Sequence, residues 1–126
     1  MTLEAIVNFD DIPRTNYTVI LGTTSALWLK LSPAASIQFE YYIDKNNARL
    51  HEGHVMARQT PKNRWIHVAG CFDGIDELSL FVDGKCQGKQ KIIYVPGERA
   101  AEPAIDVNSH GGFGGRMDSL RVSNVV

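Results

Sequence analysis

The sequence predicts an all-β protein in which two antiparallel sheets pack face to face, and three observations support this fold class. Most segments alternate apolar and polar residues with the period of two that half-buried strands show. Turn signals rich in Gly, Asp and Pro separate these segments at short intervals. No segment keeps a helical period over three turns. We therefore expect residues 1–126 to form one antiparallel β-sandwich domain.

Alternation is clear in the first half of the chain. The strands expected there are Thr2–Phe9, Tyr17–Gly22, Ala26–Leu31, Ser36–Asp44 and Glu52–Gln59. One face of the fourth segment holds only apolar or aromatic residues, namely Ile37, Phe39, Tyr41 and Ile43. Proline-containing turns are expected at Ser32–Ala35 and Thr60–Arg64.

Two consecutive hairpins are predicted in the middle of the chain. Trp65–Phe72 alternates and is followed by the turn residues Asp73 and Gly74. The next alternating segment ends at Asp83 and Gly84, which readily adopt the positive φ angles that a two-residue hairpin turn requires. Later strands are expected at Lys89–Val95, Ala104–Asn108 and Arg116–Val122, with a Gly-rich turn at Ser109–Gly115.

The two cysteines are expected to lie on strands that flank a common neighbour. The hairpin turns place Cys71 opposite Ser79 and Cys86 opposite Phe81. Two strand spacings separate the thiols by roughly 9–10 Å, which is too far for a disulfide without distortion. We expect two unpaired thiols, with a distorted bridge as the alternative.

The charge and hydropathy of the chain exclude some classes of partner. The net charge of −1 gives no electrostatic reason to expect nucleic acid or an anionic membrane surface as a partner. No apolar run is long enough to predict a membrane-spanning segment. Because Met1–Phe9 already alternates like a strand, no signal peptide is predicted in this chain.

Two motifs occur in a specific order along the chain. Residues 64–74 and 78–85 read RWIHVAGCFDG and LSLFVDGK, and residues 111–125 read GGFGGRMDSLRVSNV. Together they resemble laminin G-like domains of the concanavalin A-like lectin/glucanase superfamily. The opening TLEAIVNF is similar to a strand of such domains, although Ile6 stands where Trp is common. The resemblance covers nearly the whole chain and implies a concanavalin A-like jelly roll.

The resemblance also implies a missing element. Such domains usually begin with an additional strand that ends in a Phe-Asp-Gly turn, and this strand is absent here. We expect the chain to be part of a larger secreted or extracellular protein, with a shortened natural chain as the alternative. The absent strand would leave an open sheet edge near Thr2–Phe9 or the C-terminal strand, and such an edge favours a homodimer.

A candidate binding surface follows from the strand register. A turn centred between Pro33 and Ala35 places Lys30 opposite Gln38 and Trp28 opposite Glu40. The next strand is expected to fold back around Asn47–Arg49. It then places His54, Met56 and Arg58 on the same face, roughly opposite Tyr42, Glu40 and Gln38 in that order. The candidate ligand-binding residues on this outward face are Trp28, Lys30, Gln38, Glu40, Tyr42, His54 and Arg58, with Met56 beside them.

These residue types suit a sugar. Flat aromatic rings such as Trp28 and Tyr42 cover the C–H face of a pyranose, while amides and charges hydrogen-bond its hydroxyls. We expect Trp28 to stack on a saccharide. The alternative is that Trp28 and Tyr42 form a stabilising cross-strand pair on an ordinary sheet with one solvent-exposed face, or that another element covers them.

Calcium is a second candidate ligand, because relatives often hold Ca²⁺ with hard oxygen donors at the sheet rim. The candidate metal ligands are Asp73, Asp76 and Asp118. Aspartates at turns are, however, also explained by backbone geometry, and no cofactor is certain.

For catalysis the sequence offers no clustered acids. Retaining glucanases need two carboxyls about 5–5.5 Å apart, whereas Glu40 and Asp44 lie about 13 Å apart along an extended strand. We therefore expect a noncatalytic carbohydrate-binding module, an accessory domain whose partner is a glycan. The alternative is a structural or protein-interaction module that binds an extracellular protein.

Overall fold

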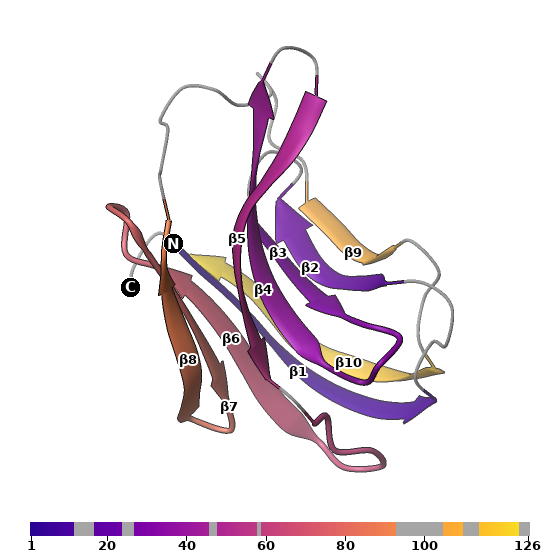
Figure 1. Ribbon diagram of the computed structural model, residues 1–126. Coiled ribbons are helices and arrows are strands. Elements are labelled where there is room, and N and C mark those ends of the chain that lie inside the picture. The colour runs from indigo at the N-terminus through magenta and orange to yellow at the C-terminus, as the bar shows by residue number, and fades with distance from the viewer. Residues whose placement is uncertain are drawn as a thin grey trace.

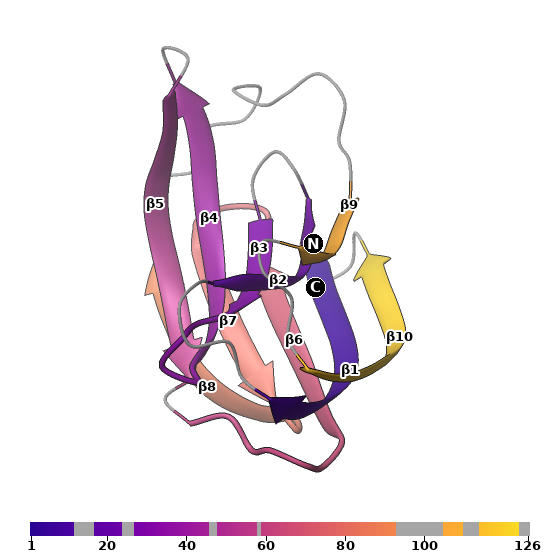
Figure 2. The ribbon, with the colours of Figure 1, turned by 90° about the vertical axis from the view of Figure 1, so that its right-hand side faces the viewer.

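The computed structural model describes residues 1–11, 17–23, 27–45, 48–57, 59–92, 105–109 and 114–123. Its strands are β1 (Thr2–Asp11), β2 (Thr18–Thr23), β3 (Leu27–Leu31), β4 (Ile37–Lys45), β5 (Ala48–Ala57), β6 (Ile66–Phe72), β7 (Glu77–Val82), β8 (Lys85–Lys91), β9 (Ile105–Ser109) and β10 (Gly114–Ser123). They form a first sheet with the order β10-β1-β6-β7-β8 and a second sheet with the order β5-β4-β3-β2-β9. Figures 1 and 2 show the two sheets stacked as layers. The predicted antiparallel β-sandwich is confirmed.

The alternation of apolar and polar residues along the strands explains which side chains form the core. On β1, the residues with odd numbers from Leu3 to Phe9 are fully buried, as are Leu29 and Leu31 on β3. Across the gap between the sheets, Tyr41 of β4 stacks on Phe72 of β6 with ring centroids 6.4 Å apart. The side chains between the sheets are therefore those that the period of two places on one face.

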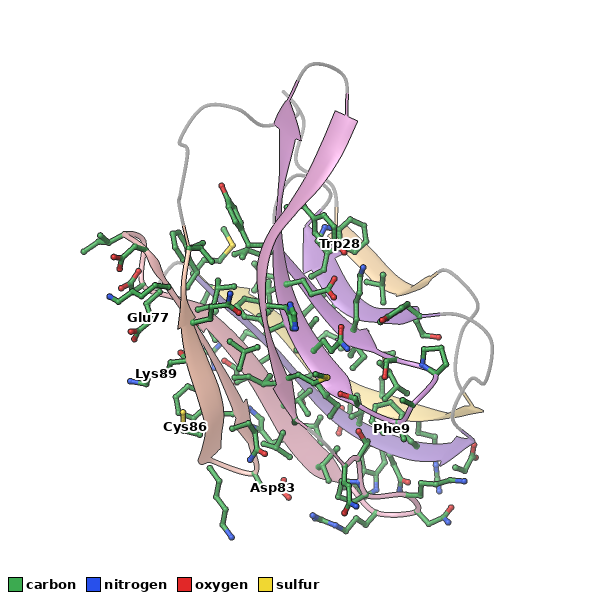
Figure 3. All side chains as sticks on the ribbon, in the orientation of Figure 1. Phe9, Trp28, Glu77, Asp83, Cys86 and Lys89 are labelled. Carbon is green, nitrogen blue, oxygen red and sulfur yellow. The ribbon has the colours of Figure 1, made fainter. Side chains whose placement is uncertain are left out.

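The second central hairpin turns as the sequence predicts. Asp83 has a φ of 50° and Gly84 a φ of 77°, as a two-residue hairpin turn requires. β8 begins directly after this turn at Lys85, earlier than the predicted Lys89, because two residues are enough to reverse the chain. Figure 3 shows Asp83 on the same side of the first sheet as Glu77 of β7 and Cys86 and Lys89 of β8.

Both cysteines are free. Cys71 pairs with Ser79 across β6 and β7, and Cys86 pairs with Phe81 across β7 and β8, as predicted. The strand β7 thus separates the two thiols.

The register of the second sheet agrees with the prediction between β3 and β4 but not between β4 and β5. Lys30 pairs with Gln38, and Trp28 pairs with Glu40. On β5, however, His54 pairs with Glu40 rather than Tyr42. The predicted partner of His54 was wrong by two residues along β4, on the same face. The reason is that β4 and β5 reverse between Lys45 and Ala48, earlier than the predicted turn, and their register shifts again between Tyr41 and Tyr42.

The position of β1 corrects a further expectation. β1 pairs with β10 on one side and with β6 on the other, so Thr2–Phe9 is not a sheet edge. The C-terminal strand β10 is an outer strand of its sheet among the strands that the structure describes. No helix in the described part of the chain is long and apolar enough to cross a membrane.

Candidate functional site

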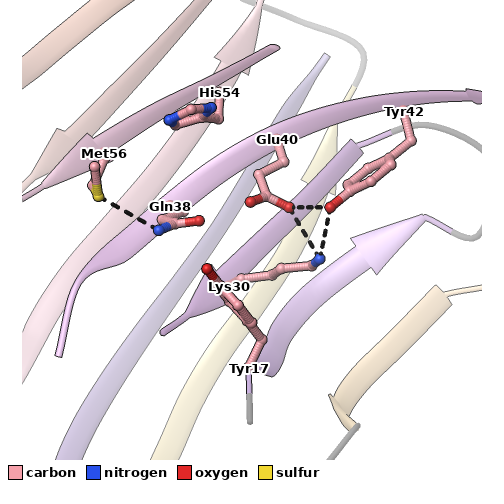
Figure 4. A pocket seen from close by; sticks show the side chains of 7 residues that line it. All are labelled: Tyr17, Lys30, Gln38, Glu40, Tyr42, His54 and Met56. Carbon is pink, nitrogen blue, oxygen red and sulfur yellow. Dashed lines mark hydrogen bonds and ion pairs between the residues drawn. The ribbon is translucent and has the colours of Figure 1, made fainter. Parts of the chain in front are cut away.

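A groove opens on the outer face of the second sheet, opposite the face that packs into the core. We call it the outer groove, and it has a volume of about 470 Å³. The described residues that line it are Tyr17, Lys30, Gln38, Glu40, Tyr42, His54 and Met56 (Figure 4). The structure thus brings together five of the seven residues that the sequence analysis proposed as ligand contacts.

Three of these side chains form a compact polar network on the groove floor. Lys30 Nζ lies 3.0 Å from Glu40 Oε2 and donates a hydrogen bond of 3.1 Å to the Tyr42 hydroxyl. The same hydroxyl donates to Glu40 Oε2 at 2.7 Å. All three contacts lie within hydrogen-bond distance, so each side chain holds the other two in place.

Aromatic rings surround the ammonium group of this network. Lys30 Nζ lies 4.9 Å from the ring centroid of Tyr42 and 5.5 Å from those of Tyr17 and Trp28. These distances are within the range of cation–π attraction. The rings therefore stabilise this partly buried cation in addition to Glu40.

Trp28 lies on the predicted face but is not available to stack on a ligand. Its ring is 6.4 Å from Tyr42 in an edge-to-face arrangement, as expected for neighbours on one face. Yet only 5% of Trp28 is exposed. A Cβ atom added to Gly22, its cross-strand partner, would come within 3.1 Å of the indole, so the ring lies directly over that glycine. The expectation that Trp28 stacks on a saccharide is therefore wrong.

Gln38 and Glu40 are more enclosed than an ordinary outward position would be. They are 7% and 6% exposed, although both face away from the core. The Gln38 amide lies beside Met56 and donates a weak hydrogen bond of 3.4 Å to its sulfur. Both polar side chains thus form a floor, while the exposed His54 and Met56 stand at the side of the groove.

Arg58, the remaining predicted contact, lies outside the described residues. The groove instead includes Tyr17, which the sequence analysis left out and which is 45% exposed. Tyr17 lies two residues before Val19, the cross-strand partner of Lys30, so it shares the face of Lys30. It was missed from the sequence because no register was assigned between this strand and the strand of Lys30. Its one sequence signal is that it directly precedes the strand that pairs with that of Lys30.

The predicted metal ligands do not converge. Asp73 Oδ1 accepts three main-chain N–H groups of its own turn, from Ile75 at 2.8 Å, Asp76 at 3.0 Å and Glu77 at 3.1 Å. The bond from the Glu77 N–H, followed by that from Ile75, lowers the pKa of Asp73 below its usual value. This carboxylate therefore shapes the backbone of the turn.

The other two aspartates have different surroundings. Asp76 Oδ1 accepts a hydrogen bond of 2.9 Å from Lys91, and this bond raises the pKa of the lysine. Asp118 is exposed on β10, at the opposite edge of the sheet from the β7–β8 hairpin. Within the described residues, no group of three potential metal-ligating side chains comes together. The calcium site expected from Asp73, Asp76 and Asp118 is not formed.

Comparison with known proteins agrees with this fold. The family Laminin_G_3, described as the concanavalin A-like lectin/glucanases superfamily, matches residues 1–126. No sequence among the curated proteins matches the chain.

Three solved structures share the fold at low sequence identity. A candidate carbohydrate-binding protein from Bacteroides ovatus has a TM-score of 0.65 and 17% identity over 95% of this chain and 36% of its own. The binding domain of Paraclostridial Mosquitocidal Protein 1 has a TM-score of 0.64 and 11% identity over 87% of this chain and 29% of its own. Galectin LEC-6 of Caenorhabditis elegans has a TM-score of 0.58 and 10% identity over 96% of this chain and 81% of its own. The chain thus spans about a third of the length of the first two proteins.

Proposed function

We propose that this chain, which belongs to the Laminin_G_3 family of the concanavalin A-like lectin/glucanase superfamily, is a noncatalytic carbohydrate-binding module. The outer groove is the site that we assign to the glycan. Two structural neighbours, a candidate carbohydrate-binding protein and a galectin, support a role of this kind for the fold.

The observation that carries the proposal is the composition of the groove. Its rim has an exposed aromatic ring at Tyr17 and an apolar side chain at Met56, which is 44% exposed. Its floor has the polar groups of Gln38, Glu40 and Lys30. A pyranose has an apolar C–H face and a periphery of hydroxyls, so it can cover the tyrosine ring and hydrogen-bond to the floor at the same time.

The carboxyl groups of the groove support a binding function without hydrolysis. Glu40 is the one acidic side chain among the described residues that line the groove. Hydrolysis by the usual glycosidase mechanisms uses a pair of carboxyls that flank the scissile bond. Glu40 is moreover held by Lys30 and Tyr42, which suits a fixed hydrogen-bond acceptor.

The partial coverage of two structural neighbours supports a role as an accessory domain. Since this chain spans only 36% and 29% of those proteins, a unit of this size occurs as one part of longer chains. We propose that the larger protein is extracellular, where glycans are displayed.

A glycan array with two matched variants tests the function. Tyr17→Ala removes the exposed ring of the groove, and we expect it to weaken glycan binding roughly tenfold, the loss of about 1.4 kcal/mol of stacking and buried area. Trp65→Ala is the control, because Trp65 is also 45% exposed but directly precedes β6, a strand of the other sheet. Equal binding by the parent and Tyr17→Ala would contradict the assigned site, and an array on which the parent binds nothing would contradict the function.

Protein interaction is a second candidate function, and Trp65 is the observation that favours it. The Arg116 guanidinium lies 5.9 Å from the centroid of this exposed ring. Exposed tryptophan and arginine are residue types that protein interfaces favour. A parent that binds no glycan on the array would leave this function as the better explanation of the domain.

A further inference from the structure

The two carboxylate oxygens of Glu40, on the groove floor, differ in their contacts. Both polar contacts of Glu40, with Lys30 and with Tyr42, use Oε2. Oε1 has no hydrogen-bond partner among the described residues, and Figure 4 shows it directed away from Lys30 toward the Gln38 side of the groove. The Glu40 side chain is only 7% exposed. An accessible acceptor oxygen on a largely enclosed side chain, with no donor from the described residues, favours a ligand that donates a hydrogen bond there.

The ammonium group of Lys30, beside Glu40, already has partners within the protein. Lys30 has 16% of its side chain exposed, and its ammonium group contacts Glu40 and the Tyr42 hydroxyl within an enclosure of three aromatic rings. Glu40 and Tyr42 engage two of the three N–H groups of Lys30, so an anionic ligand that approaches this charge also approaches the Glu40 carboxylate, which repels it. The geometry therefore opposes recognition of an anion by Lys30.

From these two features we propose that the outer groove selects uncharged glycans and rejects glycans that carry a carboxylate or sulfate where they meet Glu40. This inference rests on the proposed carbohydrate-binding function and concerns the specificity of the same site. A sugar hydroxyl donates to Glu40 Oε1, forming a charge-assisted hydrogen bond. A carboxylate or sulfate at that position has no proton to donate and is repelled by Glu40.

Among the described residues that line the groove, Glu40 is the one whose charge repels an anion. Gln38 and Met56 are uncharged, as are the two tyrosine rings. His54 is exposed and is the cross-strand partner of Glu40, so a protonated imidazole would add a positive charge beside the carboxylate. The test is therefore made at pH 8, where histidine is generally neutral.

The experiment compares matched pairs of oligosaccharides that differ only by one carboxylate or sulfate. We expect the parent protein to bind the neutral member at least about tenfold more tightly, the size of one charge-assisted hydrogen bond. Glu40→Gln should weaken the neutral member and reduce the ratio, because Lys30 then keeps its charge without a carboxylate beside it. Glu77→Gln is the control, because Glu77 is a carboxylate of β7 in the other sheet that also lies near a lysine, and it should leave both affinities unchanged.

A second variant covers the case in which Glu40→Gln fails to fold with an unpaired Lys30. Lys30→Met combined with Glu40→Gln removes both charges, and we expect it to bind both members of each pair with similar affinity. The two proposals fail in different ways. If the parent binds neither member of any pair, the carbohydrate-binding function is wrong. If binding depends on Tyr17 but the acidic member binds as well as the neutral one, the function stands and the selectivity for uncharged glycans is wrong.

Discussion

Gly70 lies where the two sheets approach too closely for a side chain. It lies on β6 with its α-carbon facing the second sheet, and the fully buried Phe39 of β4 occupies the space above it. A Cβ atom at this position would lie 2.2 Å from one ring carbon of Phe39 and 2.5 Å from another. The absence of a side chain at Gly70 therefore allows the phenyl ring to fill the core.

Gly70→Ala should accordingly destabilise the protein. The added methyl group forces Phe39 out of its position, and overpacking of this kind costs about 1–3 kcal/mol of unfolding free energy. Urea unfolding followed by circular dichroism measures the change. Combining Gly70→Ala with Phe39→Leu should recover part of the loss, because the smaller side chain leaves room for the methyl. A Gly70→Ala protein as stable as the parent would contradict the packing.

Alternation predicts the face of the strand on which a side chain lies, but not what covers that side chain. This difference explains which site residues the sequence could predict. Alternation correctly put Lys30, Glu40 and Tyr42 on one face, because the pairs of β3 with β4 follow from a single short turn. It could not show that Trp28 is covered, since its burial depends on the glycine that β2 places opposite the indole. The exposed aromatic ring of the groove is instead Tyr17, two residues before Val19, and its place follows from the pairing of Val19 with Lys30, which local sequence does not give.

At the scale of elements, the turn between β6 and β7 depends on one carboxylate. Asp73 accepts hydrogen bonds from three successive N–H groups, beginning with Ile75, and its own N–H donates to the Glu77 carbonyl at 3.1 Å. Gly74 supports the same turn with a φ of 87°. These bonds favour the charged form and lower the pKa of Asp73, the bond from Glu77 contributing most.

This pKa shift predicts an acid-dependent loss of stability. Because the pKa of Asp73 is lower in the folded than in the unfolded chain, its charge stabilises the fold above the unfolded pKa of about 3.9 and ceases to do so as pH falls through the folded value. Asp73→Asn keeps an acceptor oxygen but removes this charge. We expect the variant to be less stable than the parent at pH 7, with a difference that shrinks as the pH falls below about 4. Chemical denaturation across this range measures it, and a difference independent of pH would contradict the role of the charge.

The β4–β5 hairpin shows why local sequence gives strand pairs better than their register. The prediction put the reversal around Asn47–Arg49, whereas the pairing runs to Lys45 and Ala48 and shifts between Tyr41 and Tyr42. Together the two changes move the partner of His54 from Tyr42 to Glu40, two residues along β4, so His54 stays on the same face and still lines the groove. Polar residues mark a turn region in the sequence, but several alignments of the two strands satisfy the same alternation.

At the scale of the whole molecule, the order of the strands in the sheets could not be predicted from local sequence patterns. β1 lies between β6 and β10, which are distant from it in the sequence. Alternation predicts which face of a strand is buried but not which strands lie beside it. For this reason the sequence correctly predicted a sandwich of antiparallel sheets but left the open edge undecided between Thr2–Phe9 and the C-terminal strand. Among the described strands, Thr2–Phe9 is internal and the C-terminal strand β10 is an outer one.

The outer strands of the sheets decide how copies of the molecule could associate. β8 carries three lysines, Lys85, Lys89 and Lys91, which discourage pairing with another chain. β10 is the other outer strand of this sheet among the described strands, and it differs from β8 in carrying an exposed apolar side chain, Leu120, which is 39% exposed. Its bulge near Ser119, which has a φ of 53°, interrupts the edge only locally.

We therefore predict that the protein self-associates through β10, and that Leu120→Lys shifts it toward the monomer. A charge on the edge opposes close approach of a second strand and removes apolar area from the contact. Sedimentation velocity over a range of concentrations gives the oligomeric state. Ile75→Lys is the matched control, because Ile75 is apolar and 73% exposed but lies in the turn before β7, so this variant should associate like the parent. A parent that remains monomeric at the highest concentration would show that β10 is closed to pairing, and equal effects of the two variants would show that association depends on exposed apolar area rather than on this edge.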